Sequence, residues 1–133
     1  MSTPARINPF LLWFSQRTAG GNNRAQQLRR SIREKGFIDD PDNAVCVVRT
    51  PVSLTTLHNT RVAVTQEMDL SDIPIIIYEF DEPLPEIMVN IRRFGVAKTW
   101  GEALIYRTSR QHLEPLPPYG RLERPVMSPD EDM

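Results

Sequence analysis

The segment with the strongest chemical character is residues 54–63, which read LTTLHNTRVA. Its first half predicts a strand and its second half a helix, so the polar residues 58–61 form a turn at the helix start. The first N–H groups of a helix lack intrahelical partners and carry the positive end of its dipole, which suits phosphate. Thr60 adds a hydroxyl group, and Arg61 adds a guanidinium that can hold phosphate through two hydrogen bonds. The pattern therefore predicts a phosphate-binding turn, and the alternative is an ordinary helix cap followed by a surface arginine.

Five further residues are candidates for the same site. His58 is the best general acid or base by type, since its ordinary pKa of about 6.5 suits proton transfer. Asn59 tolerates the positive φ that a sharp turn often requires, and Thr56 is a candidate substrate ligand just before it. The polar loop that begins at Gln16 and Arg17 is expected to approach the turn and position substrate. The alternatives are a capping or solvated histidine and a solvated loop.

Charge is distributed unevenly along the chain. Residues 1–38 carry seven basic residues and one acid, a net charge of +6, whereas the whole chain has a net charge of −1. Most of this excess lies on a predicted helix, in the four arginines Arg24, Arg29, Arg30 and Arg33. The apolar stripe of this helix is formed by Ala25, Leu28 and Ile32, and Arg29, Arg30 and Arg33 are expected to point away from it. Gly36 is expected to cap the helix at its C-terminus, and a turn is expected at residues 39–43. Arginine binds phosphate in a bidentate manner better than lysine does. The helix is therefore a candidate nucleic-acid contact, and the alternative is a solvated helix face.

Cysteine and histidine are too scarce for several kinds of site. A lone Cys46 cannot form a disulfide within the chain, and an inert packing thiol is the expected role. One cysteine and two histidines predict no dedicated zinc site, and no metal-ligating residue is assigned. The cofactor is left open, with Mg²⁺ and a nucleotide as the candidates. No apolar run approaches the roughly 20 residues of a membrane-spanning helix, and no signal peptide is expected.

Strands alternate with helices along the sequence, which predicts an α/β or α+β fold with a small mixed sheet flanked by helices. The expected strands are residues 11–15, 44–49, 54–57 and 73–80. The expected helices are residues 24–35, 60–68, 86–94 and 100–111. Thr99 and Glu102 match a capping box for the last helix, and Trp100 is expected in the core rather than as a base-stacking platform. Residues 1–10 are expected to be a flexible leader, 11–112 the domain, and 113–133 a proline-rich acidic tail without its own core.

The order of these motifs resembles the ParB/sulfiredoxin-like fold, in its small toxin-type branch. In that family a turn of Asp-Gly-x-Arg type holds phosphate between a strand and a helix, and residues 58–61 stand in that place. The helix at residues 24–36 resembles the helix before the first core strand, and Ile73-Pro74-Ile75-Ile76 resembles the family's Val-Pro-Val strand. Residues 98–103 and 107–111 resemble the final part of ParB-like toxin domains of Rhs-type and contact-dependent polymorphic toxins. The resemblance covers residues 11–111.

The resemblance implies an antibacterial toxin domain, delivered as part of a larger toxin and acting in the cytoplasm of the target cell. Its expected activity is phosphodiester hydrolysis, with DNA favoured as substrate, Arg61 on the developing charge and His58 in proton transfer. Its expected partners are nucleic acid or a nucleotide and a cognate immunity protein. The alternatives are a non-catalytic nucleotide- or nucleic-acid-binding module and an interaction domain whose turn is vestigial.

One residue departs from the family pattern. His58 stands where the family prefers an acid, which puts metal-dependent chemistry in doubt and suggests that His58→Asp would raise activity. Cys46 lies well before the turn, so the catalytic cysteine of sulfiredoxins is absent.

Overall fold

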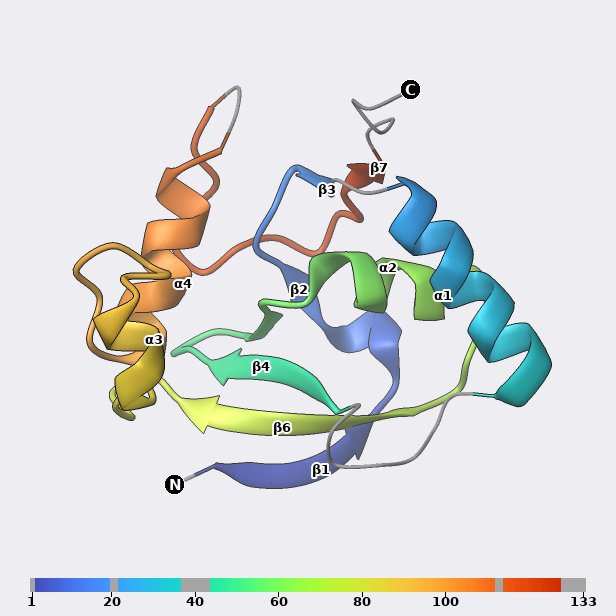
Figure 1. The fold of residues 1–133 in the computed structure, drawn as a ribbon, viewed down its shortest axis with the longest axis horizontal. Coiled ribbons are helices and arrows are strands. Elements are labelled where there is room, and N and C mark those ends of the chain that lie inside the picture. Colours follow the sequence, from blue (N-terminus) through green and yellow to red (C-terminus); the bar gives the residue numbers. More distant parts are fainter. Residues whose placement is uncertain (1, 20–21, 37–43, 112–113, 128–133) are drawn as a thin grey trace.

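A computed structural model describes residues 2–19, 22–36, 44–111 and 114–127 (Figure 1). A five-stranded sheet has the order β1-β6-β4-β5-β2, and β3 pairs with β7 in a separate two-stranded sheet. The elements are β1 (Thr3–Ile7), the 3₁₀ helix η1 (Pro9–Leu11), β2 (Trp13–Phe14), β3 (Thr18–Ala19), α1 (Asn22–Lys35), β4 (Val45–Arg49), β5 (Leu54–Thr56), α2 (Asn59–Glu67), β6 (Ile73–Glu79), α3 (Glu86–Asn90), α4 (Trp100–Ser109) and β7 (Val126–Met127). The pairs β4·β6 and β5·β2 are parallel, whereas β1·β6 and β4·β5 are antiparallel. The predicted mixed sheet with flanking helices is confirmed.

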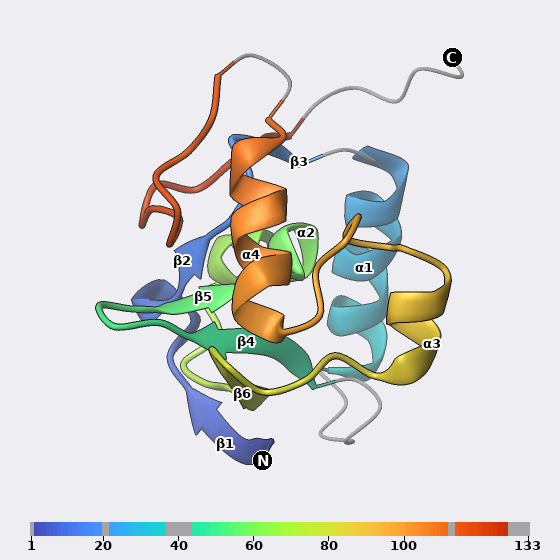
Figure 2. The same ribbon diagram turned by 90° about the vertical axis from the view of Figure 1, so that its left-hand side faces the viewer.

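The central strand β4 is buried on both faces. Val45 and Val47 join a core with β6 and α2, whereas Val48 and the half-buried Cys46 join a second core with α4. Because alternate residues of a strand point to opposite faces, α2 covers one face of the sheet and α4 the other. Figure 2, which looks onto α4, shows it in front of β4 and β5. The sheet is therefore covered on both faces, which explains why β4 reads as a continuous apolar run.

Helix α1 packs on α2 through the stripe that the sequence predicted. Ala25 and Ile32 are buried against Val64, and the half-buried Leu28 adds to this cluster. The helix ends at Gly36, whose φ of 74° is the left-handed conformation expected of a C-terminal glycine cap. The turn expected at residues 39–43 lies outside the described residues.

The expectations for residues 1–15 were wrong in two respects. The presumed flexible leader contains β1, an edge strand whose five residues pair with β6. An edge position tolerates Pro4, which lacks an N–H group, so sequence propensity alone did not indicate this strand. The expected strand at residues 11–15 is also shorter, because η1, capped by the side chain of Asn8, precedes β2.

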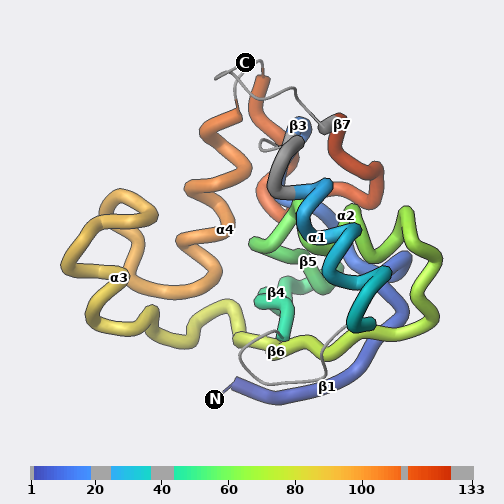
Figure 3. Tube along the Cα trace, turned by 45° about the vertical axis from the view of Figure 1, so that its right-hand side comes forward, coloured from blue at the N-terminus to red at the C-terminus, as the bar shows by residue number. Residues whose placement is uncertain are grey.

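The presumed tail packs onto the domain as far as it is described. Leu116 is buried, and Phe14 and Arg121 exchange two backbone hydrogen bonds of 2.6 and 3.0 Å. Gly120 has a φ of 86°, and a Cβ atom there would collide with the carbonyl oxygen of Phe14. Figure 3 shows β7 beside β3, which is consistent with their parallel pairing. Prolines prevent a helix here, but they allow extended backbone to pack on the domain. Through its backbone hydrogen bonds to Phe14, this segment covers the sheet edge at β2.

Candidate anion-binding site

The predicted turn lies where β5 passes into α2, and His58 is the residue before the helix. A buried threonine fixes its backbone from the interior. Thr56 is fully buried, and its hydroxyl donates to the carbonyl oxygen of Cys46 (3.1 Å) and accepts the N–H of His58 (2.9 Å). Thr56 therefore shapes the turn, and its predicted role as a substrate ligand stays a prediction.

Asn59 joins the turn to the end of strand β2. Its side-chain oxygen accepts the N–H of Ser15 (2.8 Å), and its side-chain nitrogen donates to the Ser15 hydroxyl (2.9 Å). The Ser15 hydroxyl in turn donates to the carbonyl oxygen of Thr56 (2.8 Å). Asn59 is not among the positive-φ residues of the described chain, so the turn does not use its tolerance of positive φ. Its amide joins the start of α2 to the residue after β2. Ser15 was not predicted as a site residue, because it carries no distinctive pattern.

His58 is half-buried, and its ring is held in one orientation. Its Nδ1 atom accepts the backbone N–H of Cys46 at 3.0 Å. Burial, and after it the neighbouring charges of Arg61, Arg93 and Arg107, lower the pKa of His58 to about 4. The ring is therefore neutral at pH 7, with a pKa below the ordinary value near 6.5 on which the proton-transfer role was based, and that role stays a prediction. Because Nδ1 accepts a hydrogen bond, the single ring proton belongs on Nε2.

A pocket of about 440 Å³ opens beside His58, between the α4 face of the sheet and the α3 segment. Its lining is apolar except for a few groups, among them the two arginines Arg93 and Arg107. The lining residues are Ala44, Cys46, Leu57, His58, Ile76, Tyr78, Ile87, Met88, Ile91, Arg93, Phe94, Trp100 and Arg107. No carboxylate lines the pocket among the residues that the structure describes.

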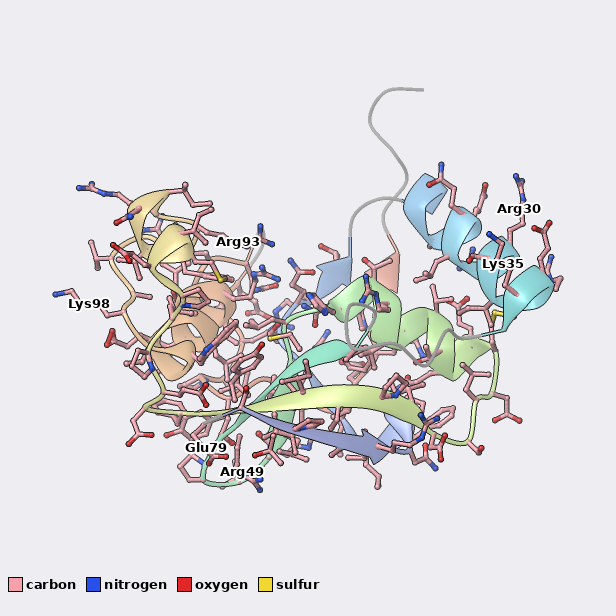
Figure 4. The ribbon with its side chains drawn as sticks, turned by 60° about the horizontal axis from the view of Figure 1, so that its bottom comes forward. Arg30, Lys35, Arg49, Glu79, Arg93 and Lys98 are labelled. Atoms are coloured by element: carbon pink, nitrogen blue, oxygen red, sulfur yellow. The ribbon has the colours of Figure 1, made fainter. Side chains whose placement is uncertain are left out.

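Arg93 and Arg107 share one aromatic neighbour. Their guanidinium carbons lie 5.6 and 5.5 Å from the centre of the Phe94 ring, within the range of cation–π contacts. Arg107 also donates a long hydrogen bond of 3.5 Å to the carbonyl oxygen of Leu57. Burial and then the charge of Arg93 lower the pKa of Arg107. In Figure 4, Lys98 points outward from this part of the molecule, whereas Arg93 lies toward its inner side.

Arg93 and Arg107 were not predicted as site residues. Arg107 belongs to a segment whose family resemblance was noted, and Arg93 follows another arginine in an exposed turn. Neither has a spacing that indicates a ligand, because their meeting depends on α3 and α4 packing beside the turn. The predicted Thr60 and Arg61 are half-buried in the first turn of α2, so Arg61 is less exposed than a surface arginine.

The two loop candidates have structural contacts. Arg17 forms an ion pair with Glu114 (3.2 Å) and donates to the carbonyl oxygens of Glu114 (3.0 Å) and Pro115 (3.2 Å). Its backbone N–H donates to the side chain of Gln111. Gln16 is half-buried and follows Ser15, whose contacts to Asn59 and Thr56 bring this loop to the turn as expected. The substrate role of Gln16 stays a prediction. Arg17 therefore anchors the segment after α4, and its substrate role stays a prediction.

The α1 arginines lie apart from the pocket. Arg29 forms an ion pair of 2.7 Å with Glu67 on α2, which contradicts the expectation that it points away from the packed stripe. Arg30 and Arg33 are exposed, and Figure 4 shows Arg30 on α1, distant from Arg93. The side chain of Arg24 lies outside the described part of the structure. None of the α1 arginines with described side chains lines the pocket.

The residues around His58 do not fit a divalent cation. Mg²⁺ requires oxygen ligands, usually carboxylates, whereas the charged groups near His58 are Arg61, Arg93 and Arg107. Among the described residues, no three His, Cys, Asp or Glu side chains gather in a metal-binding group. None of the described helices is long and apolar enough to cross a bilayer. The site is cationic, and its chemistry suits an anion.

Two predictions, one of a core residue and one of a helix cap, were confirmed. Trp100 is 5% exposed and stacks on Tyr78, with ring centres 3.9 Å apart. Thr99 caps α4 by accepting the N–H of Glu102 (3.2 Å), and the Glu102 carboxylate accepts the N–H of Lys98 (3.0 Å). Glu102 therefore belongs to the helix cap rather than to the pocket.

No family model and no curated protein matches this sequence. Among solved structures, protein Atu1540 from Agrobacterium tumefaciens is 17% identical, with a TM-score of 0.49, and the match covers 70% of this chain and 48% of that one. The C-terminally truncated chromosome-partitioning protein ParB from Caulobacter crescentus, complexed with CTP-γ-S, is 17% identical with a TM-score of 0.48, covering 68% and 53%. A Pnob8-like ParB-N domain is 17% identical with a TM-score of 0.49, covering 86% and 40%. The matched part is about half of each of these proteins or less. This chain is therefore similar to ParB-like structures, and the similarity concerns the fold alone.

Proposed function

We propose that this chain binds a phosphate-bearing ligand in the pocket beside residues 58–61. The observation that carries the proposal is the pair Arg93 and Arg107, which lie over one Phe94 ring with no carboxylate in the described lining. A ring face attracts a guanidinium but leaves its positive charge uncompensated. A bound anion would compensate both charges, with Arg61 close to the same place.

His58 acts in this site as a neutral hydrogen-bond donor. With Nδ1 engaged by Cys46, the Nε2–H group is the part of the ring available to an anionic oxygen. Protonating Nδ1 would break the bond from Cys46, and burial makes this unfavourable at pH 7. His58 therefore positions an anion rather than transferring a proton.

Nucleic acid and nucleotides are the phosphate-bearing ligands predicted from the sequence. Arg30 and Arg33 on α1 are exposed and can add sequence-independent contacts to a nucleic-acid backbone. Arg29 is less suited to this role because Glu67 engages it.

A second candidate is phosphodiester hydrolysis by a nuclease toxin domain. Three arginines near one turn support it, since they can stabilise the negative charge that develops in the transition state. This candidate carries with it delivery within a larger toxin, action in the target-cell cytoplasm and a cognate immunity protein. Proton transfer would then come from water or from a group other than His58.

The test incubates the protein with DNA, RNA and nucleotides, CTP included, with and without a chelator, and measures both binding and product. Binding that Arg107→Gln weakens and Arg110→Gln preserves supports the anion site. Arg110 is the matched control because it lies over Tyr106 (4.9 Å) and outside the pocket lining. Cleaved nucleic acid selects the second candidate, and equal binding by both variants contradicts the site.

The two candidate functions predict opposite effects of His58→Asp. A carboxylate here would neutralise part of the arginine charge, so the binding proposal expects weaker phosphate affinity. The nuclease candidate instead expects higher activity with a new dependence on divalent metal, since the family pattern has an acid at this position. Parallel measurements of affinity and cleavage, with and without a chelator, distinguish these outcomes.

A further inference from the structure

The polar side chains that line the pocket are almost all hydrogen-bond donors. His58 donates through Nε2, and Arg93 and Arg107 have donors but no acceptors. Burial raises the pKa of the Cys46 thiol to about 12, so it stays protonated and is a weak partner. The Tyr78 hydroxyl is the one strong side-chain acceptor in the described lining.

The remaining walls of the pocket are apolar. Leu57 and Phe94 are buried, Met88 is half-buried, and Ile91 is 65% exposed at the opening. Ile76, on the sheet, is half-buried as well. The volume of about 440 Å³ is in the range of small-molecule sites. One side of the pocket therefore suits an anionic group, and the rest suits a hydrocarbon surface.

A nucleoside fits this lining poorly. Its ribose hydroxyls and the N–H groups of its base are donors that need acceptors when they are buried. Each donor that is buried without an acceptor weakens binding. An aromatic or branched alkyl group has no such donors, and it gains free energy by leaving water for an apolar wall.

We propose that the pocket takes an organic phosphate whose body is apolar and free of hydrogen-bond donors, in preference to a nucleoside phosphate. This inference rests on the proposed anion site and specifies its ligand. The phosphate lies toward Arg93, Arg107 and His58. The apolar body lies against Met88 and Ile91.

Calorimetric titration with inorganic phosphate, phenyl phosphate and CMP at one pH and ionic strength tests this. We expect phenyl phosphate to bind about tenfold more tightly than either other probe, because the phenyl ring adds buried apolar area. CMP binding as tightly as phenyl phosphate, with phosphate also bound, overturns this inference but leaves the anion site standing. If none of the three probes binds, the anion site itself is overturned.

A matched pair of variants locates the apolar body. Ile91→Asn should weaken phenyl phosphate by about threefold and leave inorganic phosphate unchanged, because the substitution removes only apolar surface from the wall. Val96→Asn is the control, since Val96 is 87% exposed and outside the pocket lining. Equal phenyl phosphate affinity in wild type and both variants contradicts the placement, as does an equal loss of affinity in the two variants.

Discussion

The two ends of the molecule use arginine in opposite ways. At the α1–α2 end, Arg29 and Glu67 form an ion pair of 2.7 Å, with side chains 27% and 28% exposed. At the α3–α4 end, Arg93 and Arg107 lie over Phe94, and burial together with Arg93 lowers the pKa of Arg107. The first arrangement joins two helices. The second leaves positive charge beside a pocket, so the number of arginines in a segment does not by itself locate an anion site.

The largest expected effect is a loss of folding stability on acidification, caused by His58 at the α3–α4 end. The pKa of His58 is about 4 in the folded state and about 6.5 in the unfolded chain, so the unfolded state takes up the proton first as pH falls. The stability linked to His58 is complete above about pH 6.5 and lost as pH falls toward about 4, by about 3 kcal/mol. Denaturant unfolding of wild type and His58→Gln across this range checks it, because the glutamine variant should lack this part of the loss. Equal pH slopes would contradict the lowered pKa.

Asn59→Ala should break the hydrogen bonds that join the turn at residues 58–61 to the end of strand β2. Asn59 and Ser15 are buried, and the substitution leaves the N–H group of Ser15 unsatisfied. We expect a loss of about 2 kcal/mol in the free energy of unfolding. Chemical denaturation measures it, and Asn90→Ala, at an exposed position, serves as the control. A variant as stable as wild type would show that these hydrogen bonds are unimportant.

A pair of substitutions compares the two ends directly. Arg107→Gln should reduce phosphate affinity by about tenfold, because it removes a charge-assisted hydrogen bond, with little or no change in melting temperature. Arg29→Gln should leave phosphate affinity unchanged and cost about 0.5 kcal/mol of stability. Titration and thermal unfolding of both variants check this. The reverse assignment of effects would place the anion site at α1.

The smallest effect is expected at the exposed face of α1. If nucleic acid binds along this helix, replacing Arg30 and Arg33 with glutamine should flatten the dependence of log affinity on log salt. The slope should fall by up to about 0.9 for each phosphate that the helix no longer neutralises. Arg29→Gln should change it less, because Glu67 engages Arg29. An unchanged slope in the Arg30 and Arg33 variant would assign them to a solvated face.

Local patterns in the sequence predicted the elements that local physics controls. The apolar run of β6, the Thr99 cap of α4 and the Gly36 stop of α1 each depend on residues within a few positions of one another. The turn at residues 58–61 was located for the same reason, since a strand, polar residues and a helix follow directly. Strand β1 and the packing of residues 114–127 were missed because their pairing partners are distant in sequence.

The sequence by itself determined where a polar turn between a strand and a helix would occur and that a mixed sheet would carry it. Only the tertiary structure decided what surrounds that turn. Packing of α3 and α4 beside His58 brings Arg93 and Arg107 to one aromatic ring, and burial sets the protonation of His58. Charge and pKa at a site depend on distances and on exclusion of water, which are properties of the folded chain and not of residue order.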